Sequence, residues 1–393
     1  MRKLIVITFL LLGLLFGGIG VFFYLPTIVE GWNFGSADFR TIHLKRFDPS
    51  EEAVWMQSAE VLLPEKVERY VLIVPDRNTD RDWNSPGNEA RTGLRFARKL
   101  VESNIGVIRY SPPGSGNDQI NLTDPGLSRI ALERVLRAFQ AAKDTEAVEN
   151  SDEVSGADRI PDAPLSVLSV GEGCIVSLAA LQQPEVMRIS NIDSLYLAGC
   201  AYPETLLDGW IGRVYYNMEL TGVSADLMDR AAKIWSERKK EIDEGGLKPM
   251  DKDAWEKRLE KLKEQGMPAD LLAFEKTLSY LSRPDNIVWT RAAAHIRFQD
   301  LLTQLRESRP DLRIVHVMGE YDEEIRPADR EAMENYVRTS GIDNYEFRTL
   351  ERMDHSFCIR ESPPASPVEN MMRRRDPFVD FSPEILKLLA GAE

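Results

Sequence analysis

The stretch Leu165-Ser-Val-Leu-Ser-Val-Gly-Glu-Gly-Cys-Ile-Val-Ser-Leu-Ala-Ala180 decides the fold. Its first six residues are apolar or small, a run typical of a parallel strand that is buried on both faces. Two closely spaced glycines, Gly171 and Gly173, indicate a tight turn, and the apolar residues from Ile175 onward predict a helix. The segment therefore predicts a strand, a turn and a helix in direct succession.

The same alternation continues on both sides of this segment. Strands are predicted at residues 41–47, 54–64, 70–74, 106–110, 194–198, 312–318 and 345–350, and helices at residues 91–102, 127–143 and 383–390. Strands that alternate with helices predict an α/β fold, in which a mostly parallel sheet is covered by helices on both faces. Right-handed crossovers between the strands complete this architecture.

A long helical stretch interrupts the alternation. Residues 225–244, 251–265 and 269–282 are amphipathic and highly charged, and no strand is predicted among them. They predict a helical cap inserted into the sheet domain. The expected organisation is a transmembrane anchor (1–26), a linker (27–40), the first part of the core (41–202), the cap (203–297) and the second part of the core (298–393).

The N-terminus carries the signals of a membrane anchor. Arg2 and Lys3 precede an uncharged run of 22 residues, Leu4 to Leu25. About 20 apolar residues span a bilayer, and the bulky residues that close the run do not form a signal-peptidase site. The flanking positive charges place the N-terminus in the cytoplasm and the main domain outside it, in the periplasm or at the cell exterior. A cleaved signal peptide is the alternative interpretation.

Composition excludes some partners and cofactors. A net charge of −14 argues against nucleic acid, which requires a basic surface. The three cysteines have no metal-type spacing, and His43, His295 and His316 lack clustered partners. The sequence therefore predicts neither a metal site nor a cofactor.

Several motifs, in order along the chain, resemble those of the α/β-hydrolase superfamily. They are Asp80-Arg81-Asp82, the glycines Gly114 and Gly116, Ala198-Gly199, Gly319-Glu-Tyr-Asp322 and Asp354-His-Ser-Phe357. The chain is most similar to cap-bearing bacterial esterases and serine-aminopeptidase-like hydrolases, over residues 52 to 389. The resemblance implies an α/β-hydrolase fold in which Asp322 is the acid and His355 the base of a catalytic triad.

Two departures from the family pattern affect the chemistry. Aligned with the Gly-x-Ser-x-Gly nucleophile elbow, Gly171 takes the first glycine position and Gly173 the serine position, so the nucleophile is missing. Pro75, Asp76 and Arg77 replace the glycine-rich loop that supplies an oxyanion-hole donor, and proline has no N–H to donate. Both departures predict loss of serine-type acyl transfer.

The sequence leaves three alternatives open around this site. Cys174, Ser111 or Ser115 could replace the missing nucleophile, although a buried cysteine is more often a packing residue. Asp322 and His355 could persist only as a hydrogen-bonded pair that joins two loops. Cys174, Cys200 and Cys358 all map to the same rim, where two of them could form a disulfide or all three could be unrelated apolar residues.

The expected function follows from these features. The sequence predicts a membrane-anchored, catalytically degenerate protein that binds a small apolar ligand beneath the cap or a protein partner on its acidic surface. One alternative is a working ester hydrolase or peptidase with a non-standard nucleophile, and another is a structural protein of the cell envelope. Fold alone does not decide among them.

Overall fold

A computed structural model describes the sheet domain and the cap. It covers residues 39–47, 58–76, 79–84, 91–113, 115, 125–144, 160–189, 192–201, 204–374, 376 and 379–391. The predicted anchor, residues 4–25, and the predicted linker up to residue 38 lie outside this range. Within the described residues, no helix is both long enough and apolar enough to span a bilayer.

The core is an eight-stranded sheet in the order β1-β2-β4-β3-β5-β6-β7-β8. Its strands are β1 (Phe39–His43), β2 (Glu60–Pro64), β3 (Arg69–Val74), β4 (Ile105–Arg109), β5 (Leu165–Val170), β6 (Ile192–Ala198), β7 (Arg313–Gly319) and β8 (Tyr345–Leu350). In the part of the sheet ordered β4-β3-β5-β6-β7-β8, all neighbouring strands are parallel, whereas β2 runs antiparallel to both β1 and β4. The predicted mostly parallel sheet is confirmed.

Helices bury both faces of the sheet because successive strand residues point to opposite sides. On β3, Leu72 faces one apolar cluster and Ile73 faces the other. The first cluster includes residues of α3 (Pro125–Asp144), α4 (Gly173–Ala180), α5 (Pro184–Met187) and α11 (Phe298–Ser308), and the second includes residues of α2 (Thr92–Glu102) and α14 (Pro383–Ala390). Two more helices, α12 (Pro327–Thr339) and α13 (Pro367–Arg374), belong to the C-terminal part.

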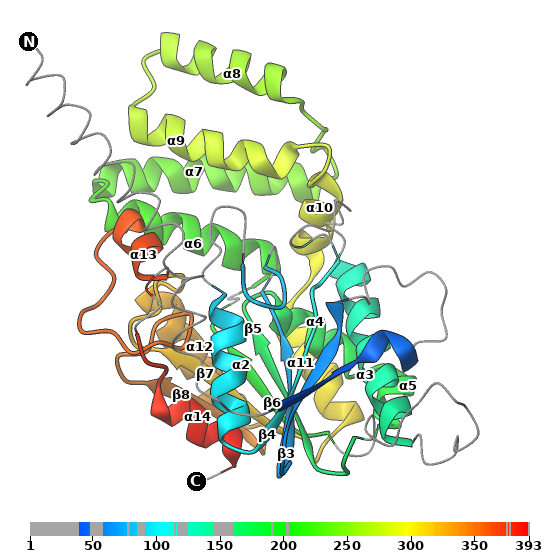
Figure 1. The fold of residues 1–393 in the computed structure, drawn as a ribbon. Coiled ribbons are helices and arrows are strands. Elements are labelled where there is room, and N and C mark those ends of the chain that lie inside the picture. The colour runs from blue at the N-terminus through cyan, green and yellow to red at the C-terminus, as the bar shows by residue number, and fades with distance from the viewer. Residues whose placement is uncertain are drawn as a thin grey trace, which may run out of the picture.

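The cap lies between β6 and β7 in the sequence, where the described residues contain helices and no strand. It comprises α6 (Leu206–Leu220), α7 (Ala225–Asp243), α8 (Lys252–Glu264), α9 (Ala269–Ser279), the short 3-10 helix η5 (Tyr280–Ser282) and α10 (Ile287–His295). Figure 1 shows α6, α7, α9 and α8 stacked in that order away from the sheet. Trp255, which is 4% exposed, is the buried residue of the outermost helix, α8.

Two predicted strands differ from the observed elements. Residues 41–47 were expected to form one strand, but the strand ends at His43 and a 3-10 helix, η1 (Leu44–Phe47), follows it. The strand predicted at residues 54–64 is described only as β2, five residues long. Helix α6 was not predicted, and it supplies a side chain of the candidate site.

Candidate active site

The loops that follow β3, β5, β6, β7 and β8 meet at one edge of the sheet. Parallel strands bring their carboxyl ends together, and ligand sites of open α/β sheets lie at that edge. The loops carry Asp76 after β3, Gly171 after β5, Cys200 after β6, Asp322 after β7 and His355 after β8. The structure therefore gathers five of the predicted site positions at one edge.

The turn after β5 corrects the predicted register of the elbow. Gly171 directly follows the strand and has φ +54°, the left-handed conformation that glycine adopts readily. Glu172 is already right-handed helical, and α4 begins at Gly173. The tip of the elbow is thus Gly171, and Gly173, predicted to hold the serine position, lies two residues beyond it inside the helix.

Gly173 has a packing role instead. A Cβ at this residue would lie 2.6 Å from the carbonyl oxygen of Val74 and 2.8 Å from that of Pro75. Backbone oxygens at these distances leave no room for a side chain, so glycine lets α4 approach β3 closely. Pro75 is buried beside it, whereas Arg77 lies outside the described residues.

The carboxylate of Asp76 occupies the space at the elbow tip. A Cβ on Gly171 would overlap this carboxylate. Asp76 Oδ1 accepts a hydrogen bond of 2.6 Å from the backbone N–H of Glu172. In an α/β-hydrolase, the N–H of the residue after the nucleophile donates to the oxyanion. At this tip, that donor is bound to a fixed carboxylate from the chain itself.

Asp322 and His355 form the pair that the family motifs imply. His355 Nδ1 lies 3.0 Å from Asp322 Oδ2 and 3.1 Å from Oδ1. Gly199 has φ +60°, and a Cβ there would lie 2.6 Å from Cε1 of His355, so glycine makes room for the imidazole. The backbone N–H of His355 donates to Glu323 Oε2 and fixes the loop.

The other ring nitrogen of His355 faces a carboxylate and no hydroxyl or thiol among the described residues. Its Nε2 lies 3.7 Å from Glu324 Oε2, an ion-pair distance rather than a hydrogen bond. Burial disfavours the charged imidazolium, but Glu324 and Asp322 outweigh it and raise the pKa of His355 to about 10. Carboxylates on both sides of the ring therefore favour the protonated imidazolium.

The cap contributes two side chains to the site. Arg213, from α6, places Nη1 2.6 Å from Glu324 Oε2 and 3.2 Å from Asp76 Oδ2. Trp289, from α10, donates its indole N–H to Glu172 Oε1 at 3.0 Å. The cap thus closes directly over the elbow. Sequence reasoning missed both residues, as well as Glu324, although the acidic run Asp322-Glu323-Glu324 after a buried strand was a visible signal.

Cys174 is not a free thiol, which contradicts the alternative in which it replaces the missing nucleophile. It forms a disulfide with Cys200, and the two Cα atoms are 6.6 Å apart. The bond joins the start of α4 to the loop after β6, while Cys358 remains free and buried. Of the alternatives left open for the cysteines, a disulfide between two of them is the one observed.

The candidate serines are engaged elsewhere. Ser115 Oγ donates to the carbonyl of Pro112, and Ser111 Oγ accepts from the backbone N–H of Arg81. The Ser115 hydroxyl therefore holds its own loop in place, and the Ser111 hydroxyl joins its loop to the segment after β3. Neither contact supports a role as a nucleophile.

These observations together identify the architecture. The sheet contains parallel strands in the order β4-β3-β5-β6-β7-β8, and β5 leads through a sharp turn into α4. The Asp322–His355 pair lies on the loops after β7 and β8. This combination is the arrangement of an α/β-hydrolase. The chain has an α/β-hydrolase fold.

Solved structures similar to this chain include hydrolases of low sequence identity. A thermostable carboxyl esterase from Bacillus coagulans, in complex with glycerol, is 14% identical to this chain, with a TM-score of 0.46. The alignment covers 90% of this chain and 98% of the esterase chain. An esterase from Pyrococcus furiosus is 11% identical, with a TM-score of 0.43, and the alignment covers 91% of this chain and 90% of the esterase chain. The α/β-hydrolase GrgF from Penicillium is 13% identical with a TM-score of 0.41, covering 85% and 94%. No protein-family model and no curated protein matches the sequence.

His316 supports the disulfide side of the site and makes stability depend on pH. It lies in β7 with no exposure, its Nε2 2.7 Å from the carbonyl of Cys200 and its Nδ1 3.0 Å from the hydroxyl of Tyr345. Burial lowers the pKa of His316 to about 4, although its hydrogen bond to Cys200 acts in the opposite direction. The folded state therefore binds fewer protons than the unfolded chain between about pH 4 and 6.5, and stability falls as the pH drops through that range.

We expect this one group to lower the free energy of unfolding by about 2 kcal/mol between about pH 7.5 and pH 5. Urea denaturation of the wild type and of His316→Phe at both pH values measures the contribution. Between the two pH values, the free energy of unfolding of His316→Phe should change by about 2 kcal/mol less than that of the wild type. Equal pH dependence in the two proteins would mean that His316 is not buried in its neutral form.

Proposed function

We propose that this protein is a membrane-anchored α/β-hydrolase-fold protein that has lost serine-type acyl transfer and acts by binding. The observation that carries the proposal is the elbow tip. Gly171 offers no nucleophile, and the Asp76 carboxylate occupies both the space of the missing side chain and the N–H of Glu172.

The two losses act independently on the reaction. Without a nucleophile, triad catalysis typically falls on the order of 10⁶-fold. Loss of one oxyanion donor costs about 100- to 1000-fold more. Asp76 itself is a poor substitute nucleophile, because an N–H and the Arg213 guanidinium both stabilise its charge.

Sequence and structure both support a location outside the cytoplasm. The apolar run Leu4–Leu25 with Arg2 and Lys3 before it favours a single-pass anchor whose N-terminus is cytoplasmic. The Cys174–Cys200 disulfide favours an oxidising compartment, because cytosolic reductants keep most thiols reduced. These features agree on a main domain in the periplasm or at the cell exterior.

The charges at the site favour a protein partner over a small apolar ligand. Asp76, Glu324 and Arg213 converge at the elbow, and burying an apolar ligand among these charges gains little. The outer cap offers a groove of about 640 Å³ between α8 and α9, lined mainly by charged side chains including Lys257, Glu260 and Lys276. A protein partner whose surface carries both acidic and basic side chains would be complementary to this groove.

Pre-steady-state cleavage of p-nitrophenyl acetate tests the loss of catalysis. We expect the full chain in detergent to show no burst and only a slow background rate. His355→Ala should leave that rate unchanged, because the imidazole at this elbow has no nucleophile from which to take a proton. A burst, or a rate that falls with His355→Ala, would contradict the proposed function.

A further inference from the structure

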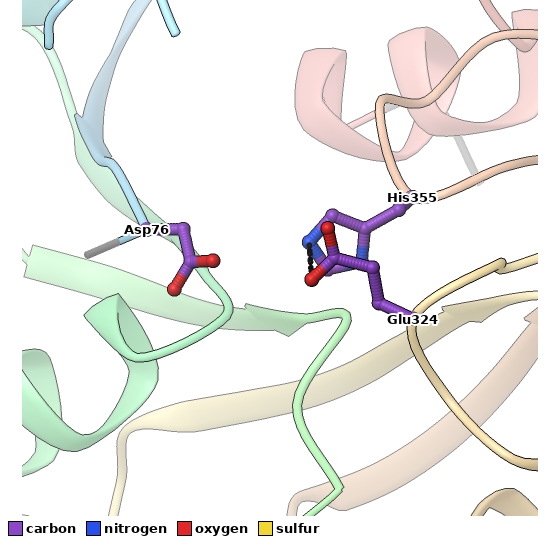
Figure 2. A group of neighbouring side chains, drawn as sticks. All are labelled: Asp76, Glu324 and His355. Carbon is purple, nitrogen blue, oxygen red and sulfur yellow. Dashed lines mark ion pairs between the residues drawn. The ribbon is translucent and has the colours of Figure 1, made fainter. Parts of the chain in front are cut away.

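Three side chains at the elbow lie close enough together to share one cation. Asp76, Glu324 and His355 each offer one ligand atom, and these atoms all lie within 4.8 Å of one another. Figure 2 shows Asp76 facing Glu324 and His355 across the site. Ligands bound at about 2.0–2.3 Å from a shared ion lie within roughly 4.6 Å of each other. A small shift of side chains therefore brings all three into one coordination shell.

A buried atom without a hydrogen bond points to a missing ligand. The His355 side chain is 8% exposed, and its Nε2 has no hydrogen-bond partner among the described residues. A buried polar atom that stays unsatisfied destabilises the folded state. Its Nδ1 is held by Asp322, and a carboxylate on the far nitrogen is the usual way in which proteins orient a metal-binding histidine.

We propose that the former catalytic centre is a divalent transition-metal site, with Asp76, Glu324 and His355 as ligands and Asp322 orienting the imidazole. One imidazole with two carboxylates favours Zn²⁺ or Mn²⁺ over Ca²⁺ or Mg²⁺, which prefer oxygen ligands alone. This inference rests on the proposed function, because the same residues cannot serve a metal and a serine triad together.

Arg213 is the built-in competitor of the metal. Its guanidinium lies within ion-pair distance of both carboxylates, where it neutralises the charge that a cation would bind. Metal binding must displace this guanidinium from the two carboxylates. Because Arg213 belongs to α6, occupation of the site by metal loosens one contact between the cap and the core.

Titration of the full chain in detergent, stripped with a chelator, tests the site. We expect one Zn²⁺ to bind per chain by calorimetry, with Mn²⁺ also binding and Mg²⁺ failing to compete. Asp76→Asn and Glu324→Gln should each weaken Zn²⁺ binding at least about 10-fold. The Asp76→Asn side chain keeps an oxygen for the N–H of Glu172, so the elbow should remain folded. Arg213→Gln should strengthen binding because the competing cation is removed.

Glu219 and Arg326 provide matched controls. They form an ion pair of 2.6 Å, also between α6 and the segment after β7, but neither residue is one of the three candidate ligands. Glu219→Gln and Arg326→Gln should leave Zn²⁺ affinity unchanged. Thermal melting without metal shows whether each variant is folded, and only folded variants are compared.

The outcomes separate this inference from the proposed function. The proposed metal site is overturned if neither the wild type nor Arg213→Gln binds Zn²⁺ or Mn²⁺. It is also overturned if Asp76→Asn and Glu324→Gln bind Zn²⁺ as tightly as the control variants do. In either case the proposed loss of acyl transfer stands, provided that no ester burst is seen. A His355-dependent burst would overturn the proposed function whatever the metal titration gives.

Discussion

Gly171→Ser combined with Asp76→Ala is expected to hydrolyse p-nitrophenyl acetate at least about 100-fold faster than Gly171→Ser alone. A serine at Gly171 takes the left-handed position at the elbow tip, but its Cβ overlaps the Asp76 carboxylate. Removing that carboxylate makes room for the hydroxyl and frees the N–H of Glu172 for the oxyanion. Steady-state rates of the two folded variants measure the gain.

Gly173→Ser with Asp76→Ala is the matched control for the register of the elbow. Its Cβ meets the carbonyl oxygens of Val74 and Pro75, so this variant should be destabilised and inactive. If the Gly173 variant were the active one, the turn would be centred two residues later than described. Equal rates for Gly171→Ser with and without Asp76→Ala would show that Asp76 does not block the tip.

Removing the disulfide is expected to destabilise the protein strongly. Cys174 and Cys200 are 26 residues apart in sequence, and closing a loop of that length stabilises a fold by about 3.5 kcal/mol through the unfolded state. Cys174→Ala with Cys200→Ala should therefore lower the free energy of unfolding by about that amount. Guanidinium denaturation of the wild type with and without reductant should show the same loss.

Cys358 supplies the control for this prediction. It is free and buried, so Cys358→Ala should keep the full sensitivity to reductant. Thiol counting in denaturant should find one reactive thiol in the wild type and none in Cys358→Ala. Three thiols in the wild type, with stability unaffected by reductant, would contradict the disulfide.

The sheet and the Asp322–His355 pair could be predicted because their signals are local. Continuous apolar runs mark the buried strands, and short motifs mark the two loops that bring Asp322 and His355 together. The tip of the elbow was placed two residues late because Gly171 matches the first glycine of the motif, and that alignment puts Gly173 at the serine position. Only the backbone shows that Gly171 has positive φ while Gly173 packs against β3.

The remainder of the site depends on contacts between distant segments. Arg213 was missed because α6 was not predicted, although Thr205 and Asp208 form a capping box at its start that the sequence displays. Asp76 and Glu324 were not expected to meet, because they lie on different loops. The metal-ligand geometry arises only when three loops converge, so residue spacing did not indicate it.

The mass of the intact chain after exposure to a fluorophosphonate tests the central claim most directly. That claim is that no side chain at the elbow tip can be acylated or phosphonylated. We expect the mass of the wild type to stay unchanged, while the variant with both Gly171→Ser and Asp76→Ala gains one adduct. A phosphonyl adduct on any residue of the wild-type elbow would contradict the account.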